Sequence, residues 1–169
     1  MYTWWRMLLI DINQTKLQTM NQTGVILKLW LESRTRLTNQ FAQLTKNDLL
    51  KRLHPQSNCI GFLLKHIGEV EQLFARNVFG LDIKGSIETL GIGKDKGQYT
   101  DLQQLLDYLD ESKVYLEQAI GNVLPDEWNE EITTKEFGTR TKAHAVGRIT
   151  SHTAYHAGQI GIILKYGSV

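Results

Sequence analysis

Apolar residues recur at alternating spacings of three and four in four segments of the chain, the pattern of helices that bury one face in a bundle. Both prolines, Pro55 and Pro125, fall where such a pattern stops, as expected for a residue that cannot continue a helix. The pattern therefore predicts an all-α four-helix bundle. The positions that carry it are Ile26, Trp30, Leu37, Phe41 and Leu44; Cys59, Leu63, His66, Val70 and Leu73; Leu102, Leu105, Leu109, Leu116, Ala119 and Val123; and Ala145, Ile149, His152, His156, Ile160 and Ile163.

The connections between these segments are polar. Residues 80–99, between the second and third segments, are rich in glycine. A link of this length can cross the end of a bundle, so the second and third helices need not be antiparallel neighbours. Strand-like alternation is confined to "EEITTKEF", residues 130–137, which we expect to be too short to build a sheet.

The ends of the helices carry recognisable signals. Ser57 or Asn58 is expected to cap the second helix and Thr100 the third, because short polar side chains accept hydrogen bonds from the first free backbone N–H groups. Gly167 is expected to end the fourth helix.

Length and composition indicate one domain. We expect a single domain over residues 1–169, with residues 1–20 as an extension of the first helix or a separate short helix. This N-terminal stretch contains an apolar cluster that we expect to cap the bundle or to lie in a homodimer interface. The cluster consists of Tyr2, Trp4, Trp5, Met7, Leu8 and Ile10.

The charge balance excludes some classes of protein. The 19 basic and 18 acidic residues are mixed along the chain, without the basic stripe typical of nucleic-acid binding, so we expect no nucleic-acid partner. The N-terminal apolar stretch is too short to cross a membrane and lacks a signal cleavage site. One cysteine, Cys59, permits no intrachain disulfide. A cytoplasmic protein without membrane association is expected.

Three of the five histidines, His66, His152 and His156, occupy core positions of the helical pattern. Residues four apart on a helix differ by about 40° in direction and about 6 Å in rise, so His152 and His156 point the same way. A histidine on a neighbouring helix, about 8–10 Å away, can reach the same point. The three histidines can be interpreted in two ways. They are either the ligands of one divalent cation that keeps coordination positions open, or core residues whose ring nitrogens are hydrogen-bonded within the protein. His54, before a proline, and His144, off the ligand face, are expected at the surface.

Several polar residues lie near these histidines in the helical pattern. Glu69, three residues after His66, is interpreted as a polar flank, or alternatively as a partner that fixes an imidazole tautomer; it is also our only candidate for a catalytic general base. Glu71 is expected at the surface. Gln159 is expected to have a structural role, either a hydrogen bond to a ligand histidine or a bridge between helices, rather than a direct catalytic role. Cys59 is expected to pack as a small hydrophobe.

Two stretches resemble the DinB-like family of four-helix bundles, which includes the bacillithiol transferases. They are "SNCIGFLLKHIGEVEQLF", residues 57–74, and "HTAYHAGQIGIILKYG", residues 152–167. The resemblance extends over residues 24–167, strongly at these motifs and weakly between them. It implies an up-down-down-up order of helices, and it implies that the three core histidines are the metal ligands. One departure is Ala157, where many relatives carry an arginine.

The resemblance also implies a function. An ion held by three neutral histidines lowers the pKa of a bound thiol or water. The first hypothesis is a metal-dependent enzyme that transfers a low-molecular-weight thiol to a small electrophilic molecule. The alternatives are a metal-dependent hydrolase and a non-catalytic metal-binding module in stress response. Zinc or nickel is the expected metal, although imidazole also suits copper and iron.

Overall fold

The computed structural model describes residues 22–91 and 93–169. The described part of the first helix spans residues 22–38. It is followed by α2 (Ile60–Asn77), α3 (Leu102–Gly121) and α4 (Lys142–Tyr166). The prediction of an all-α four-helix bundle is confirmed. The expected N-terminal extension, residues 1–20, and its apolar cluster lie outside the described residues.

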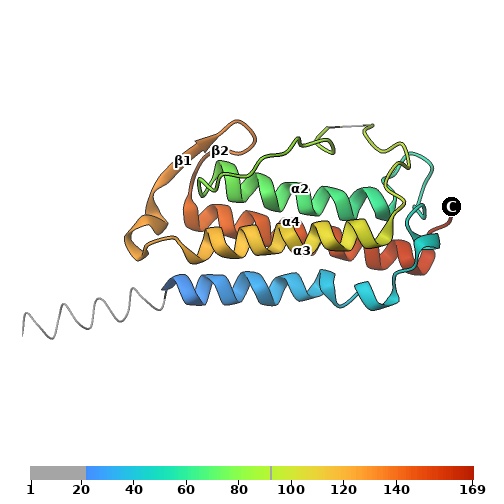
Figure 1. Cartoon of the computed structure of the whole chain (residues 1–169), viewed down its shortest axis with the longest axis horizontal. Helices are drawn as coiled ribbons and strands as arrows, with labels where there is room; N and C mark the ends of the chain where they lie inside the picture. Colours follow the sequence, from blue (N-terminus) through green and yellow to red (C-terminus); the bar gives the residue numbers. More distant parts are fainter. Residues whose placement is uncertain (1–21, 92) are drawn as a thin grey trace, which may run out of the picture.

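The helices are arranged up-down-down-up. In Figure 1 the first helix and α4 run in one direction, whereas α2 and α3 run in the other. Among α2, α3 and α4, the most extensive packing is between α2 and α3, which are parallel neighbours. An 18-residue helix such as α2 is about 27 Å long, and the long link that follows it returns along this length to the start of α3.

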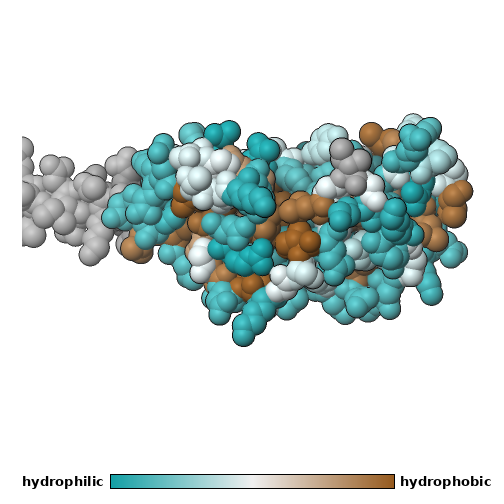
Figure 2. All heavy atoms as spheres, turned by 90° about the horizontal axis from the view of Figure 1, so that it is seen from above, coloured by the Kyte–Doolittle hydropathy of each residue, from teal (hydrophilic) through white to brown (hydrophobic). Residues whose placement is uncertain are grey.

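The interior consists of two apolar clusters along the bundle. One is built around the large side chains of Trp30, Phe74 and Trp128. The other includes Leu37 and Leu109. On the face seen in Figure 2, hydrophilic side chains cover most of the surface, and apolar side chains show only between them. None of the described helices is both long and apolar enough to cross a membrane.

A short hairpin corrects the expectation for residues 130–137. Strand β1 (Glu131–Thr134) pairs antiparallel with β2 (Gly138–Thr141). Gly138 has a φ of +66°, which glycine adopts without strain in the tight turn. The hairpin places Phe137 against Phe74 of α2, with ring centroids 4.5 Å apart. The second strand was missed because its residues are polar and mostly exposed.

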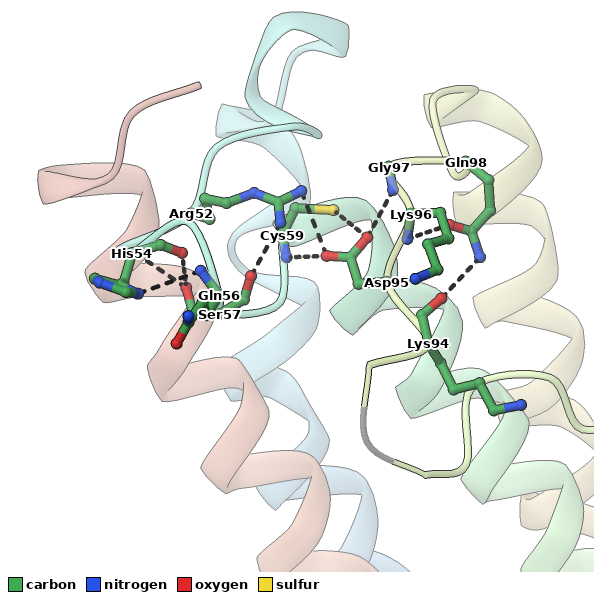
Figure 3. Close-up of polar contacts among 10 residues, drawn as sticks. All are labelled: Arg52, His54, Gln56, Ser57, Cys59, Lys94, Asp95, Lys96, Gly97 and Gln98. Atoms are coloured by element: carbon green, nitrogen blue, oxygen red, sulfur yellow. Dashed lines mark hydrogen bonds and ion pairs between the residues drawn. The ribbon is translucent and has the colours of Figure 1, made fainter.

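The predicted cap of α2 was wrong. Neither Ser57 nor Asn58 caps this helix; it begins after Cys59, whose backbone N–H donates to Asp95 Oδ2 at 2.6 Å (Figure 3). Arg52 lies 3.5 Å from the same oxygen. The long link therefore supplies the cap of α2 from 36 residues away in the chain.

Local hydrogen bonds define the start of α3 and the end of α4. Thr100 does not cap α3, because the cap is the next residue, Asp101, whose side chain accepts from the backbone N–H of Gln104 at 3.1 Å. Gly167 follows the last residue of α4, as predicted, and its N–H donates to the carbonyl of Ile163 at 2.7 Å.

Candidate metal centre

The three predicted histidines meet between α2 and α4. One ring nitrogen from each of His66, His152 and His156 lies within 4.8 Å of the other two, and all three residues are half-buried. The Nε2 atoms of His66 and His152 are 3.1 Å apart. Two nitrogens bound to one tetrahedral ion at 2.0–2.1 Å would be about 3.4 Å apart. The site is therefore placed so that one metal ion could bind between the rings.

The tautomer of His66 follows from a chain of hydrogen bonds. Glu69 Oε2 accepts from two backbone N–H groups, at 2.8 and 3.0 Å, and from the Thr89 hydroxyl at 2.5 Å. Because a hydroxyl has one proton, Thr89 Oγ1 can only accept from His66 Nδ1, 3.0 Å away. The proton of His66 therefore resides on Nδ1, and the lone pair of Nε2 faces the other histidines.

The same logic applies to His156. Its Nδ1 lies 2.7 Å from Gln159 Oε1, an acceptor, so Nδ1 carries the proton and Nε2 is the free ligand atom. His152 differs, because its Nδ1 is buried and has no hydrogen-bond partner among the described residues. The two fixed tautomers and the close Nε2 atoms fit a metal ion bound by three imidazoles.

The environment keeps these rings neutral. Burial lowers the pKa of His66 to about 4, with a smaller effect from nearby His156. Burial lowers the pKa of His152 to about 3, assisted by the charges of His156, His66 and Arg148. The pKa of His156 is also lowered by burial. Neutral imidazole is the form that binds metals, so the free ligand atoms are available at neutral pH.

Residues 29–160 match the sequence pattern of the DinB superfamily. The chain belongs to the DinB superfamily. The fold is similar to that of a crystal structure described as the conserved protein of a locus from Enterococcus faecalis, with a TM-score of 0.68 and 15% identity. The match covers 86% of this chain and 96% of that chain. No curated protein matches the sequence at a significant level.

The structure places most other candidates of this DinB superfamily member outside the ligand cluster. Glu69 is fully buried and holds His66 through Thr89, so the interpretation as a polar flank was wrong and the alternative as a tautomer-fixing partner is favoured. Glu71 is also fully buried, in an ion pair with Arg34, and was wrongly expected at the surface. The reason is its position on α2, which is covered on nearly every side.

The remaining candidates behave as predicted. Gln159 hydrogen-bonds His156, and His54 and His144 are exposed. Cys59 is buried, and its thiol donates to Asp95 Oδ1 at 3.4 Å (Figure 3). Burial raises the pKa of this thiol to about 11, so the protonated form predominates at neutral pH.

Two residues near the histidines were not identified from the sequence. Thr89 lies in the irregular link, where no periodicity indicates which side chains turn inward. Arg148 precedes His152 by four residues, so the helical spacing that paired the histidines also signals that Arg148 lies on their side of α4. A cavity of about 490 Å³ lies beside His152 and Arg148.

The metal-free protein is expected to lose stability as the pH falls from 7.5 to 5.5. The histidines of the unfolded chain take up protons below pH 6.5, whereas His66 and His152 in the folded protein resist protonation until about pH 4 and 3. The unfolded state thus gains protons first, and the loss continues down to those lower values. Urea unfolding at pH 7.5 and at pH 5.5 measures the loss of stability as a decrease in the urea midpoint. His152→Leu should reduce the pH dependence. Equal urea midpoints of the wild type at the two pH values would contradict the assignment.

Proposed function

We propose that this protein binds one divalent metal ion through Nε2 of His66, His152 and His156 and activates a low-molecular-weight thiol for transfer to a small electrophilic molecule. The observation that carries the metal proposal is the hydrogen bonding of Nδ1 of His66 and of His156, which places the lone pair of each ring on Nε2. An ion held by neutral ligands keeps its full charge and lowers the pKa of a thiol bound to it.

An open site is favoured over a closed structural one. Structural zinc sites have four protein ligands, whereas catalytic sites have three and leave a position for substrate. In the part of the chain that the structure describes, the ligand cluster contains three residues and no fourth. Its half-buried rings and the adjacent cavity give a small molecule access to the remaining positions.

Thiol chemistry is favoured over hydrolysis by the surroundings of the cluster. A free thiol has a pKa of about 8.5 and needs only a modest decrease to ionise at neutral pH, whereas water starts at 15.7 and hydrolysis usually also employs a general base. Glu69, the only candidate base, already accepts three hydrogen bonds on one oxygen and contacts His66 through Thr89. Its role in this proposal is to orient His66, and the cluster includes no carboxylate of the described residues.

The metal is proposed to be zinc or nickel. Imidazole nitrogens suit both ions, and the cluster has no thiolate among its described members that would select a softer metal. Metal analysis of the untagged protein, purified without added metal, identifies the ion. A stoichiometry of one ion per chain, lost in His66→Ala, supports the proposal, and the absence of any bound transition metal after reconstitution contradicts it.

The transfer reaction is tested with the metal-loaded protein, a panel of cellular thiols and a chromogenic electrophile. Thiol-dependent product formation above the uncatalysed rate, lost in a variant without the three histidines and retained in His144→Ala, supports the enzyme. Metal binding with no acceleration for any thiol would instead support the non-catalytic module. Product formation from water without a thiol would support the hydrolase.

Thr89→Val is expected to weaken metal binding by about 10- to 100-fold, the usual effect of removing a partner behind a ligand histidine. Valine keeps the shape of threonine but offers no acceptor to His66 Nδ1 and no proton to Glu69. Competition with a chromophoric chelator measures the affinity. Thr100→Val, at an exposed threonine directly after the same link, is the matched control. An unchanged affinity in Thr89→Val would show that the hydrogen-bond chain does not fix His66.

A further inference from the structure

The cavity beside the histidines combines one cation with an apolar wall. Its volume of about 490 Å³ lies within the 300–1,000 Å³ range of small-molecule sites. Val70 and Phe74 of α2 and Phe137 of the hairpin supply apolar lining. The α4 residues that line the cavity are Arg148, Ser151, His152 and Tyr155. One end of the cavity is thus a ligand histidine, and the lining nearby is aromatic.

Arg148 is oriented toward this space by two features of the structure. It precedes His152 by one helical turn, so the two side chains leave the same side of α4. Its guanidinium carbon lies 5.2 Å from the centroid of the Phe137 ring, which holds the group against the cavity wall. Within residues 22–91 and 93–169, Arg148 forms no ion pair, whereas Lys142, earlier on α4, contacts both Glu127 and Glu130 at 2.9 Å.

An arginine beside an apolar wall recognises a particular class of ligand. Guanidinium groups pair with carboxylates and other oxyanions through charge-assisted hydrogen bonds, often two at once. The ring faces and aliphatic groups of the wall favour a flat apolar body. A ligand with both features would bury its body against Phe74 and Phe137 and direct its anionic group to Arg148.

We propose that this cavity binds the electrophilic substrate, and that the substrate is a small organic anion with a planar apolar body whose carboxylate pairs with Arg148. The proposal rests on the proposed function in one respect: it takes the histidine cluster as the place where the bound molecule reacts. Recognition by Arg148 is a property of the chain itself and is measurable with or without a metal ion.

The test uses two probes with the same body, 2-naphthoate and its neutral amide 2-naphthamide. Calorimetric titration into the metal-free and metal-loaded protein is expected to show naphthoate binding about tenfold or more tightly than naphthamide in both forms. Arg148→Gln should bring the two affinities together without changing that for naphthamide. Arg140→Gln, at an exposed arginine of the hairpin, is the matched control and should keep the difference.

The outcomes separate this proposal from the proposed function. Equal affinities for the two probes in the wild type, or a preference that survives Arg148→Gln, would overturn the cavity assignment. Naphthoate binding only to the metal-loaded protein and independent of Arg148 would also overturn it, while leaving metal binding intact. An Arg148-dependent preference in a chain that binds no metal would support the cavity assignment and refute the proposed function.

Discussion

His152→Ala is expected to lower the affinity for a divalent metal ion by at least about 100-fold, because removing even a partner behind a ligand costs 10- to 100-fold. The change deletes the nitrogen that lies 3.1 Å from His66 Nε2 and leaves two possible ligands on two different helices. Two imidazoles hold an ion much less well than three, and the cluster offers no replacement among the described residues. Competition with a chromophoric chelator at pH 7.5 measures the loss.

The control for this change is His144→Ala, which removes an exposed imidazole from the same helix. It should bind metal as the wild type does. Circular dichroism and a urea midpoint for both variants show whether the bundle remains folded, so that a lost affinity is not a lost fold. An affinity for His152→Ala within twofold of the wild type would mean that the ion binds elsewhere.

The sequence predicts the convergence of the histidines because helical geometry is local. The spacing of four fixes His152 and His156 on one side of α4, and the apolar pattern places His66 on the interior of α2. The helical pattern does not show that α2 packs against α4, which the structure does. The order of helices came from the family resemblance, since the length of the link at residues 80–99 permits more than one path.

The polar surroundings of the site could not be predicted in the same way. Thr89 and Asp95 lie in an irregular link, and their partners, His66 and Cys59, are 23 and 36 residues away. No periodicity relates such positions. Glu71 was misplaced for a different reason: a charged residue is rarely buried without a partner, and its partner, Arg34, is on another helix.

Three buried polar side chains, those of Arg34, Glu71 and Thr153, connect different helices of the bundle. Arg34 reaches from the first helix to Glu71 on α2 and to the carbonyl of Leu109 on α3. Thr153, directly after His152 on α4, lies 3.5 Å from the same carboxylate. All four helices therefore contribute to one network, which sets their relative positions next to the three histidines of the candidate metal centre.

Arg34→Met is expected to reduce the free energy of unfolding by about 3–5 kcal/mol, the usual effect of leaving one member of a buried ion pair without its partner. Both side chains are nearly inaccessible, at 3% and 0% exposure, and Arg34 donates to both oxygens of Glu71 at 2.9 and 3.2 Å. Methionine fills much of the same volume but supplies no charge. Urea unfolding at pH 7.5 measures the loss, and Arg36→Met, at an exposed arginine of the same helix, should change the stability little.

Two further measurements show whether Arg34→Met destabilises the protein by leaving the buried charge of Glu71 unpaired or by a packing defect. Burial raises the pKa of Glu71, and without Arg34 this rise is larger. As the pH falls, Glu71 therefore takes up a proton in the folded variant before it does so in the unfolded chain. The difference in free energy of unfolding between the variant and the wild type should therefore become smaller as the pH falls from 7.5 to 5.5. The double variant Arg34→Met/Glu71→Met should recover most of the loss, since replacing both members of a buried pair is often neutral or stabilising. A deficit that is independent of pH and persists in the double variant would mean that Arg34 stabilises the bundle by filling space rather than by neutralising Glu71.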